Sequence, residues 1–280
     1  MPEVEEVLDL FFYRPIAFIL VKSIYATNIT PNMLTLTSIL VSIVAGCFYA
    51  VGTAEYVTYG ALLFLAHLII DCSDGQLARL KKNGTHAGRI IDGVGDFFST
   101  VAVFIGLGMG YQIHNYDPLI WWSLLLVTML SNGIQSVLVD YYGSRFLDYV
   151  LQRKSTFEED LDSFKEEYER IKELKNRSFD KFIISAYIKY SALQSRLSGK
   201  KENEKLFIAT PQDYYKKNVI AMRMWLFIGP TTQVSVLIFC SLINRFDIFF
   251  WLMIGGFNSM ALLMWLIQRN IDKTFKPILK

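Results

Sequence analysis

Six apolar segments, each long enough to cross a lipid bilayer, constrain this chain more than any other feature. They cover residues 32–52, 56–79, 88–113, 118–147, 219–243 and 247–268. A helix needs about 20 mostly apolar residues to span the hydrocarbon core, and 52% of the chain is hydrophobic, which is too apolar for an ordinary soluble domain. We therefore predict an all-α polytopic membrane protein with six transmembrane helices.

The segment before the first span, residues 5–28, alternates apolar and charged residues at helical spacing. Arg14, Pro15 and Lys22 interrupt it, so a short additional span would bury charge in lipid. An amphipathic helix lying in the membrane interface suits this pattern better. The first ten residues lack the basic start of a secretory signal, so we expect no cleaved leader.

The distribution of basic residues predicts how the spans are oriented. With the amino terminus inside, the short outer loops are residues 52–57, 113–118 and 243–247, and they contain one basic residue, Arg245. Because cytoplasmic loops carry the excess of Lys and Arg, both termini are expected to be cytoplasmic. The protein is then a multi-pass component of the cell membrane or another inner membrane. We expect no nucleic-acid partner.

A charged block separates the fourth and fifth spans. Residues 152–217 contain two stripes of apolar residues at helical spacing, which predicts a cytoplasmic helical hairpin. A solvated extension, a dimer contact and a regulatory arm all remain open for it. The predicted parts are an interfacial helix (1–30), spans one to four (31–151), the hairpin (152–217), and spans five and six with a tail (218–280).

Four aspartates flank the loop between the second and third spans. Asp71 and Asp74 share one side of a helix, and Asp92 and Asp96 follow Gly88 at intervals of four residues on the next. Two helices joined by a short loop are antiparallel, so the two carboxylate faces can meet.

Four carboxylates placed close together repel one another strongly in a low dielectric. The nearby Arg79 and Arg89 are too few to neutralise them. Divalent cations with oxygen ligands would do so, and a pair of bridged cations is an arrangement used in phosphoryl chemistry. The later glycines Gly106, Gly108 and Gly110 indicate close helix packing rather than a nucleotide site.

The spacing resembles the signature of the CDP-alcohol phosphotransferase (phosphatidyltransferase) family: Asp71-x2-Asp74-Gly75-x2-Ala78-Arg79-x8-Gly88-x3-Asp92-x3-Asp96. The segment "TPNMLT", Thr30 to Thr35, and the six spans are also similar to that family. The resemblance covers roughly residues 10–150 and 219–270, and the insertion 152–217 departs from it.

The resemblance implies a reaction in which a CDP-linked donor gives a substituted phosphate to an alcohol and CMP leaves. It implies two Mg²⁺ ions, which Mn²⁺ can replace, held by Asp71, Asp74 and Asp92. Asp96 is then a shared metal ligand and the general base. The implied nucleotide and donor contacts are Asn32, Thr35, Asp71, Gly75, Ala78, Arg79 and Gly88.

The substrates are less constrained than the reaction. We expect phosphatidyl transfer from CDP-diacylglycerol to a small polar alcohol such as inositol, inositol phosphate, glycerol phosphate or serine, in a homodimer that uses membrane lipid. The alternative is a CDP-inositol, CDP-choline or CDP-ethanolamine donor with a lipid or inositol-phosphate acceptor.

Arg145, Arg223 and Gln135 are candidates for binding the acceptor, since arginine pairs well with an anionic alcohol. Arginines that anchor the protein at lipid headgroups, and a glutamine that bonds between helices, are the competing interpretations. Two other functions stay open, a divalent-cation transporter and a scaffold built on the hairpin. A transporter would place acidic residues on several helices, whereas here they gather on one pair.

Overall fold

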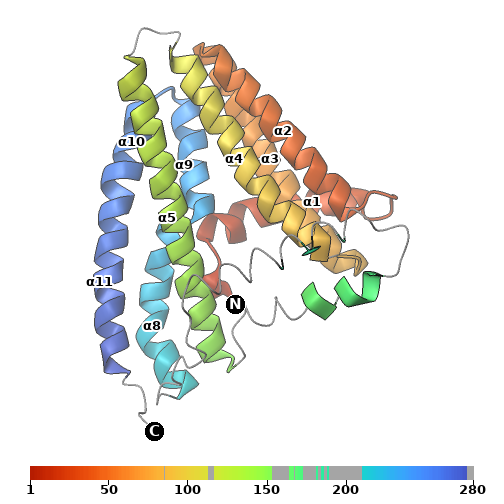
Figure 1. Ribbon diagram of the computed structural model, residues 1–280, viewed down its shortest axis with the longest axis vertical. Coiled ribbons are helices and arrows are strands. Elements are labelled where there is room, and N and C mark those ends of the chain that lie inside the picture. The colour runs from red at the N-terminus through yellow and green to blue at the C-terminus, as the bar shows by residue number, and fades with distance from the viewer. Residues whose placement is uncertain are drawn as a thin grey trace.

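The computed structural model describes residues 1–84, 86–112, 117–152, 164–166, 168–172, 181, 184–185, 188 and 210–275, and most of these residues are helical while none lies in a strand. Six helical segments are long and apolar enough to span a membrane, so the predicted fold class is confirmed. Figure 1 shows these segments running along the long axis of the molecule.

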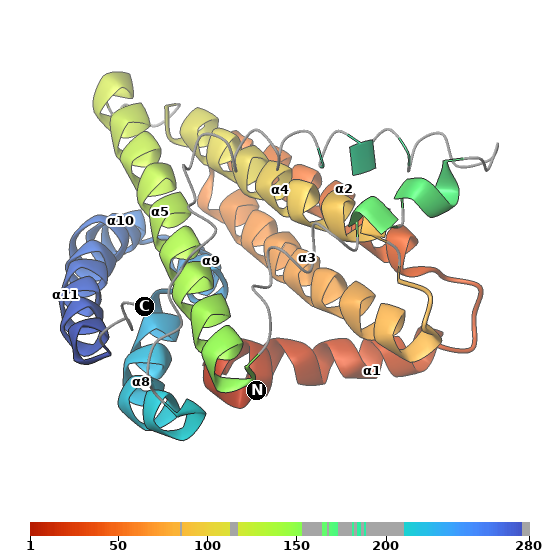
Figure 2. The same cartoon turned by 60° about the horizontal axis from the view of Figure 1, so that its bottom comes forward.

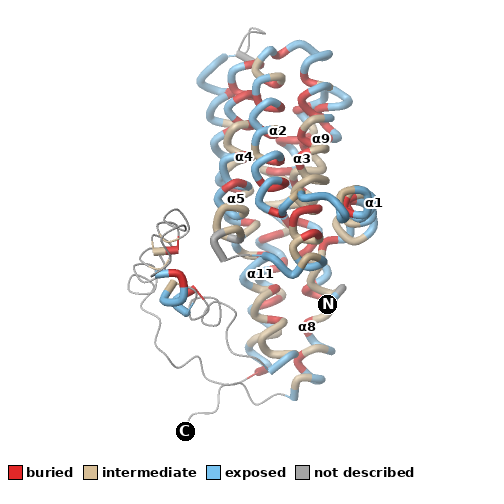
Figure 3. Tube along the Cα trace, turned by 90° about the vertical axis from the view of Figure 1, so that its right-hand side faces the viewer, coloured by how far each residue is buried: buried red, intermediate tan, exposed pale blue. Residues whose placement is uncertain are grey.

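The chain begins with a short helical turn, η1 (Pro2–Val4), and a π-helical stretch, η2 (Asp9–Tyr13), which continues into α1 (Arg14–Ile24). Helix α1 is seen nearly end-on in Figure 3 while the long helices run along the picture, so it lies across the bundle. Its large apolar residues Phe18 and Ile19 are exposed. This orientation is compatible with the predicted interfacial helix, which stays a prediction.

The first four spans are unbroken helices: α2 (Pro31–Val51), α3 (Ala54–Lys81), α4 (His86–Gln112) and α5 (Pro118–Val150). Local sequence fixes where two of them begin. The Thr30 hydroxyl accepts a hydrogen bond from Met33 N before α2, and the Asp117 carboxylate accepts one from Leu119 N before α5. In both cases proline follows the capping residue, where its missing N–H costs nothing.

The fifth span is interrupted. It consists of α8 (Pro211–Trp225), a 3₁₀ turn η3 (Leu226–Ile228) and α9 (Pro230–Leu242). Pro230 lacks the N–H that a continuous helix would use, so the chain ends one helix at Gly229 and starts another. Helix α8 begins within the residues assigned from the sequence to the hairpin. Most of the predicted hairpin lies outside the described residues.

The sixth span also changes geometry along its length. A short helix α10 (Phe246–Phe250) passes through a π-helical stretch η4 (Trp251–Phe257) into α11 (Asn258–Thr274). In Figure 2, α8, α11 and α5 form one group of helices and α2, α3 and α4 form another. Contacts of α9 with α3, and of α5 with α4, join the two groups.

Helices α2 and α4 approach each other through glycine. A Cβ placed on Gly106 would lie 2.1 Å from the carbonyl oxygen of Gly46, and one on Gly110 would lie 2.1 Å from that of Tyr49. One on Gly108 would meet the Trp122 ring at 2.3 Å. The packing interpretation of this glycine run is therefore confirmed.

Hydrogen bonds connect the amino-terminal segment to the start of α9, where the fifth span is interrupted. The Glu6 carboxylate is buried, with 6% of its surface exposed, and it accepts hydrogen bonds from Thr231 N at 3.1 Å and Thr232 N at 2.7 Å. It therefore sits at the positive end of α9. Burial raises the pKa of Glu6 above its usual value. The Tyr13 and Ser235 hydroxyls are 2.7 Å apart one turn further along.

Candidate active site

The spacing of the aspartates in the sequence places them on facing helices, as expected from the short connection between α3 and α4. Ligand oxygens of Asp71, Asp74 and Asp92 all lie within 4.8 Å of one another. Asp96 approaches the Asp71 carboxylate to hydrogen-bonding distance and is itself exposed. The two carboxylate faces therefore meet.

Helix α2 lies next to this cluster and contacts both helices that carry it. It packs along both α3 and α4, whereas α3 and α4 approach each other at few positions. Space is therefore left between the two aspartate-bearing helices. The Thr35 hydroxyl of α2 donates to Asp74 Oδ2, and the Ser38 hydroxyl lies 3.5 Å from Asp71 Oδ1.

The composition of the cluster fits a divalent cation. The described salt bridges include no cationic side chain paired with Asp71, Asp74 or Asp92. Asp92 Oδ1 is buried and has no hydrogen-bond partner. An orphaned carboxylate oxygen facing two further carboxylates is costly unless a cation occupies the space between them. The residues present thus match the oxygen ligand set that Mg²⁺ and Mn²⁺ prefer.

The residues expected around a nucleotide lie at the same end of the bundle. Arg79 is exposed, and its Nη1 would lie 3.6 Å from a Cβ placed on Gly75, so its guanidinium folds back over that glycine. Asn32 is exposed in the first turn of α2, and Gly88 lies in the first turn of α4. The Thr35 hydroxyl donates to Asp74, and its contact with a nucleotide stays a prediction.

Gln135, a candidate for the acceptor, belongs to a buried network of amides inside the bundle. Its Oε1 accepts from Gln233 Nε2 at 3.0 Å, and its Nε2 donates to Asn258 Oδ1 at 2.7 Å. Asn258 Nδ2 in turn donates to Ser131 Oγ at 2.9 Å, and Asn132 donates to Gln233. The competing interpretation, hydrogen bonding between helices, describes what its side chain does in this structure.

The two arginine candidates lie on other helices than the aspartates, α5 and α8. Arg145 Nη1 donates to Asp272 Oδ2 at 2.8 Å across α5 and α11, and its guanidinium lies 5.8 Å from the centre of the Tyr149 ring. Arg223 is exposed on α8. Arg145 thus has a structural partner, and its role toward an acceptor stays a prediction, as does that of Arg223.

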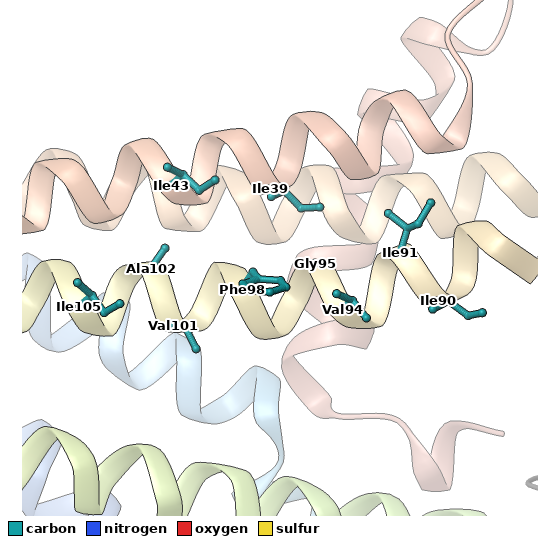
Figure 4. A pocket seen from close by; sticks show the side chains of 10 residues that line it. All are labelled: Ile39, Ile43, Ile90, Ile91, Val94, Gly95, Phe98, Val101, Ala102 and Ile105. Atoms are coloured by element: carbon teal, nitrogen blue, oxygen red, sulfur yellow. The ribbon is translucent and has the colours of Figure 1, made fainter. Parts of the chain in front are cut away.

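An apolar groove of about 680 Å³ follows the seam between α2 and α4 (Figure 4). Its walls include Ile39, Val94, Phe98 and Val101. Val94 and Val101 lie on the opposite side of α4 from Asp92, given the helical repeat. The groove is consequently turned away from the carboxylates, and its apolar lining excludes it as a nucleotide site.

The sequence interpretation overlooked three serines that pack between the helices of the cluster, Ser38, Ser42 and Ser99. His67, one helical turn before Asp71, brings its Nδ1 to 3.0 Å from the Ser38 carbonyl oxygen. The Ser42 and Ser99 hydroxyls are 2.7 Å apart between α2 and α4. The spacing of Thr35, Ser38 and Ser42, which places hydroxyls on one face of a helix, was the signal that could have revealed them.

Comparison with known proteins identifies one domain. Residues 28–145 match the family model described as CDP-alcohol phosphatidyltransferase. This part of the chain is therefore a CDP-alcohol phosphatidyltransferase domain. The matched residues include α2, α3 and α4, and therefore every aspartate of the cluster, so the resemblance inferred from the motif is confirmed.

Part of the chain is similar to a curated protein. The chain is 31% identical over 108 residues to the ceramide phosphoethanolamine synthase of Drosophila melanogaster. The alignment covers 36% of this chain and 27% of the relative. The chain thus spans about a quarter of the length of that relative.

Proposed function

We propose that this protein is a membrane enzyme that transfers a substituted phosphate from a CDP-linked donor to an alcohol and releases CMP. The observation that carries the proposal is the group of three carboxylates within 4.8 Å, set between α3 and α4 inside a CDP-alcohol phosphatidyltransferase domain. A divalent cation would relieve the repulsion within such a group, and the name of the matched domain specifies a CDP-linked donor, which carries a diphosphate.

Asp71, Asp74 and Asp92 would hold two Mg²⁺ ions, with Mn²⁺ as a substitute and Asp96 as a shared ligand. When bound, the ions neutralise the diphosphate and stabilise the charge that develops on departing CMP. Arg79, folded over Gly75, is suitably placed to pair with a phosphate oxygen. Asn32, Ala78 and Gly88 complete the donor site in this proposal.

Asp96 acts as the general base. Its exposed carboxylate accepts the proton of the acceptor hydroxyl while the alcohol oxygen forms a bond to the phosphorus that carries the substituent. The bond from that phosphorus to the oxygen of CMP breaks, and CMP leaves with its electron pair.

Two substrate arrangements remain, and a specific observation supports each. The segment "YRPIAFILVK" and the following "TPNMLT" are similar to inositol-type members of the family, which supports inositol or an inositol phosphate as the acceptor in phosphatidyl transfer from CDP-diacylglycerol. The name of the relative favours the opposite arrangement, in which a CDP-linked polar alcohol is the donor and a lipid hydroxyl is the acceptor. We place the former first.

The proposal includes the setting of the enzyme. The concentration of Lys and Arg on one side of the spans supports an active site and two termini that face the cytoplasm. We further propose a homodimer, and acceptor contacts from Arg145, Arg223 or Gln135 after rearrangement of their present bonds.

Purified full-length protein in lipid nanodiscs tests the reaction. It is incubated with Mg²⁺ and either CDP-diacylglycerol with the polar alcohols or CDP-ethanolamine with ceramide and diacylglycerol, and products are identified by mass spectrometry. CMP release that requires both a donor and an alcohol supports the proposal. Absence of CMP from every pair, with folded protein, refutes it. Asp96→Asn should release no CMP while keeping its melting temperature, and retained turnover would remove Asp96 as the base.

A further inference from the structure

The carboxylate cluster is built on two helices that depend on a third for their separation. Helix α2 packs along both α3 and α4, which themselves approach at few positions. Three hydroxyl residues of α2, Thr35, Ser38 and Ser42, lie on one face and are buried, with 4%, 0% and 0% of their surfaces exposed. Each contacts α3 or α4 through a hydrogen-bonding group.

Thr35 makes the most direct of these contacts. Its hydroxyl has one proton and two nearby acceptors, the Pro31 carbonyl oxygen at 3.2 Å and the closer Asp74 Oδ2. A carboxylate is a stronger hydrogen-bond acceptor than a neutral carbonyl, so the Thr35 hydroxyl donates its hydrogen bond to Asp74. The bond fixes the rotation of the Asp74 carboxylate about its side chain.

The next two residues fix the register of the helices. The Ser38 carbonyl oxygen lies 3.0 Å from His67 Nδ1 on α3, one turn from Asp71. The Ser42 hydroxyl lies 2.7 Å from that of Ser99 on α4. Contacts with the same face of α2 thus position both the carboxylates of α3 and the carboxylates of α4.

We propose that Thr35 is a positioning residue for the divalent-cation site, acting through Asp74 rather than by contact with the nucleotide. Its hydroxyl holds one oxygen of Asp74 so that the other points toward Asp71 and Asp92. Residues that orient metal ligands in this way typically contribute about 10–100-fold to metal affinity. The inference rests on the cation site of the proposed function and deepens it.

Mn²⁺ binding to the full-length protein, measured by electron paramagnetic resonance without any nucleotide, tests this role. Thr35→Val removes the hydroxyl at nearly constant volume, and Thr35→Ser retains it. Thr37→Val is the matched control, because Thr37 is exposed and its hydroxyl donates only to the Met33 carbonyl oxygen at 2.8 Å. We expect Thr35→Val to weaken Mn²⁺ binding roughly 10–100-fold, Thr35→Ser to restore it to within about threefold, and Thr37→Val to match the wild type.

Each other result has a distinct meaning. If Thr35→Val binds Mn²⁺ like the wild type and instead raises only the KM of the CDP-linked donor, Thr35 contacts the nucleotide and the inference is wrong. If the wild type binds no Mn²⁺, the cation site of the proposed function fails, and this inference fails with it. Should Thr35→Val not fold, Thr35→Cys replaces it, because a thiol is a weak donor of similar size; wild-type affinity in that variant also overturns the inference.

Discussion

Neutralising one carboxylate of the cluster should stabilise the protein when no cation is bound, even though it removes activity. Two unit charges separated by the 4.8 Å that bounds the ligand oxygens of Asp71, Asp74 and Asp92 repel by about 3.5 kcal/mol at an effective dielectric constant of about 20. Asp92 takes part in two of the three pairs, so Asp92→Asn removes about 7 kcal/mol of repulsion before screening is considered. Asp71 and Asp92 are partly exposed, and screening by solvent and salt reduces this to about 1–3 kcal/mol.

The assay is thermal unfolding of purified protein in nanodiscs at pH 8, with either EDTA or Mg²⁺. We expect Asp92→Asn to melt above the wild type in EDTA, by roughly 2–4 °C for each kcal/mol gained. Mg²⁺ should raise the melting temperature of the wild type and leave that of Asp92→Asn nearly unchanged. Asp140→Asn is the matched control, since it removes a carboxylate of α5 that is outside the cluster.

Two results would refute the reasoning about repulsion. A melting temperature for Asp92→Asn below that of the wild type in EDTA would mean that the carboxylates are neutralised without a cation. An equal response of both proteins to Mg²⁺ would place the stabilising ion somewhere other than between α3 and α4.

Three further predictions concern other parts of the structure. Gly106→Ala should destabilise the protein by about 1–3 kcal/mol in thermal unfolding, because the new Cβ would meet backbone of α2, whereas Gly133→Ala, with nothing within 4 Å, should be neutral or slightly stabilising. Burial raises the pKa of Glu6, so ionisation of this carboxyl opposes folding. The stability of the wild type should therefore fall as the pH rises from 4.5 through the raised pKa of Glu6. Glu6→Gln should show a smaller slope of melting temperature against pH. Arg145→Met should cost about 1–3 kcal/mol by leaving the Asp272 carboxylate without this bond, and Asp272→Asn in the same chain should recover part of the loss in thermal unfolding.

The sequence was sufficient to predict the transmembrane segments and the proximity of the aspartates, because both depend on residues that are close together in the chain. A run of apolar residues determines a span, and a short loop between two spans makes α3 and α4 antiparallel, which brings Asp71 and Asp92 to the same end. The start of α2 was also readable, since Thr30 caps a helix that begins at proline.

Contacts between distant parts of the chain could not be read in this way. Glu6 bonds to Thr231 and Thr232 across more than 220 residues, and no local pattern pairs them. Gln135 looked like a possible acceptor ligand because a polar residue in a span can either line a pocket or bond to another helix. Only the positions of Gln233 and Asn258 distinguish the two roles.

The glycine contacts explain why the site is placed on α4 rather than on the fifth span. Backbone contact at Gly46 and Gly106 leaves no side chain that can change rotamer, so it fixes the distance between α2 and α4. Because α4 is a single helix from His86 to Gln112, that fixed distance extends along the helix to the aspartates. The fifth span, broken at Gly229–Pro230, cannot transmit a position in the same way. Carboxylates that must share a cation need ligand positions held within a fraction of an ångström, and helices without a break supply them.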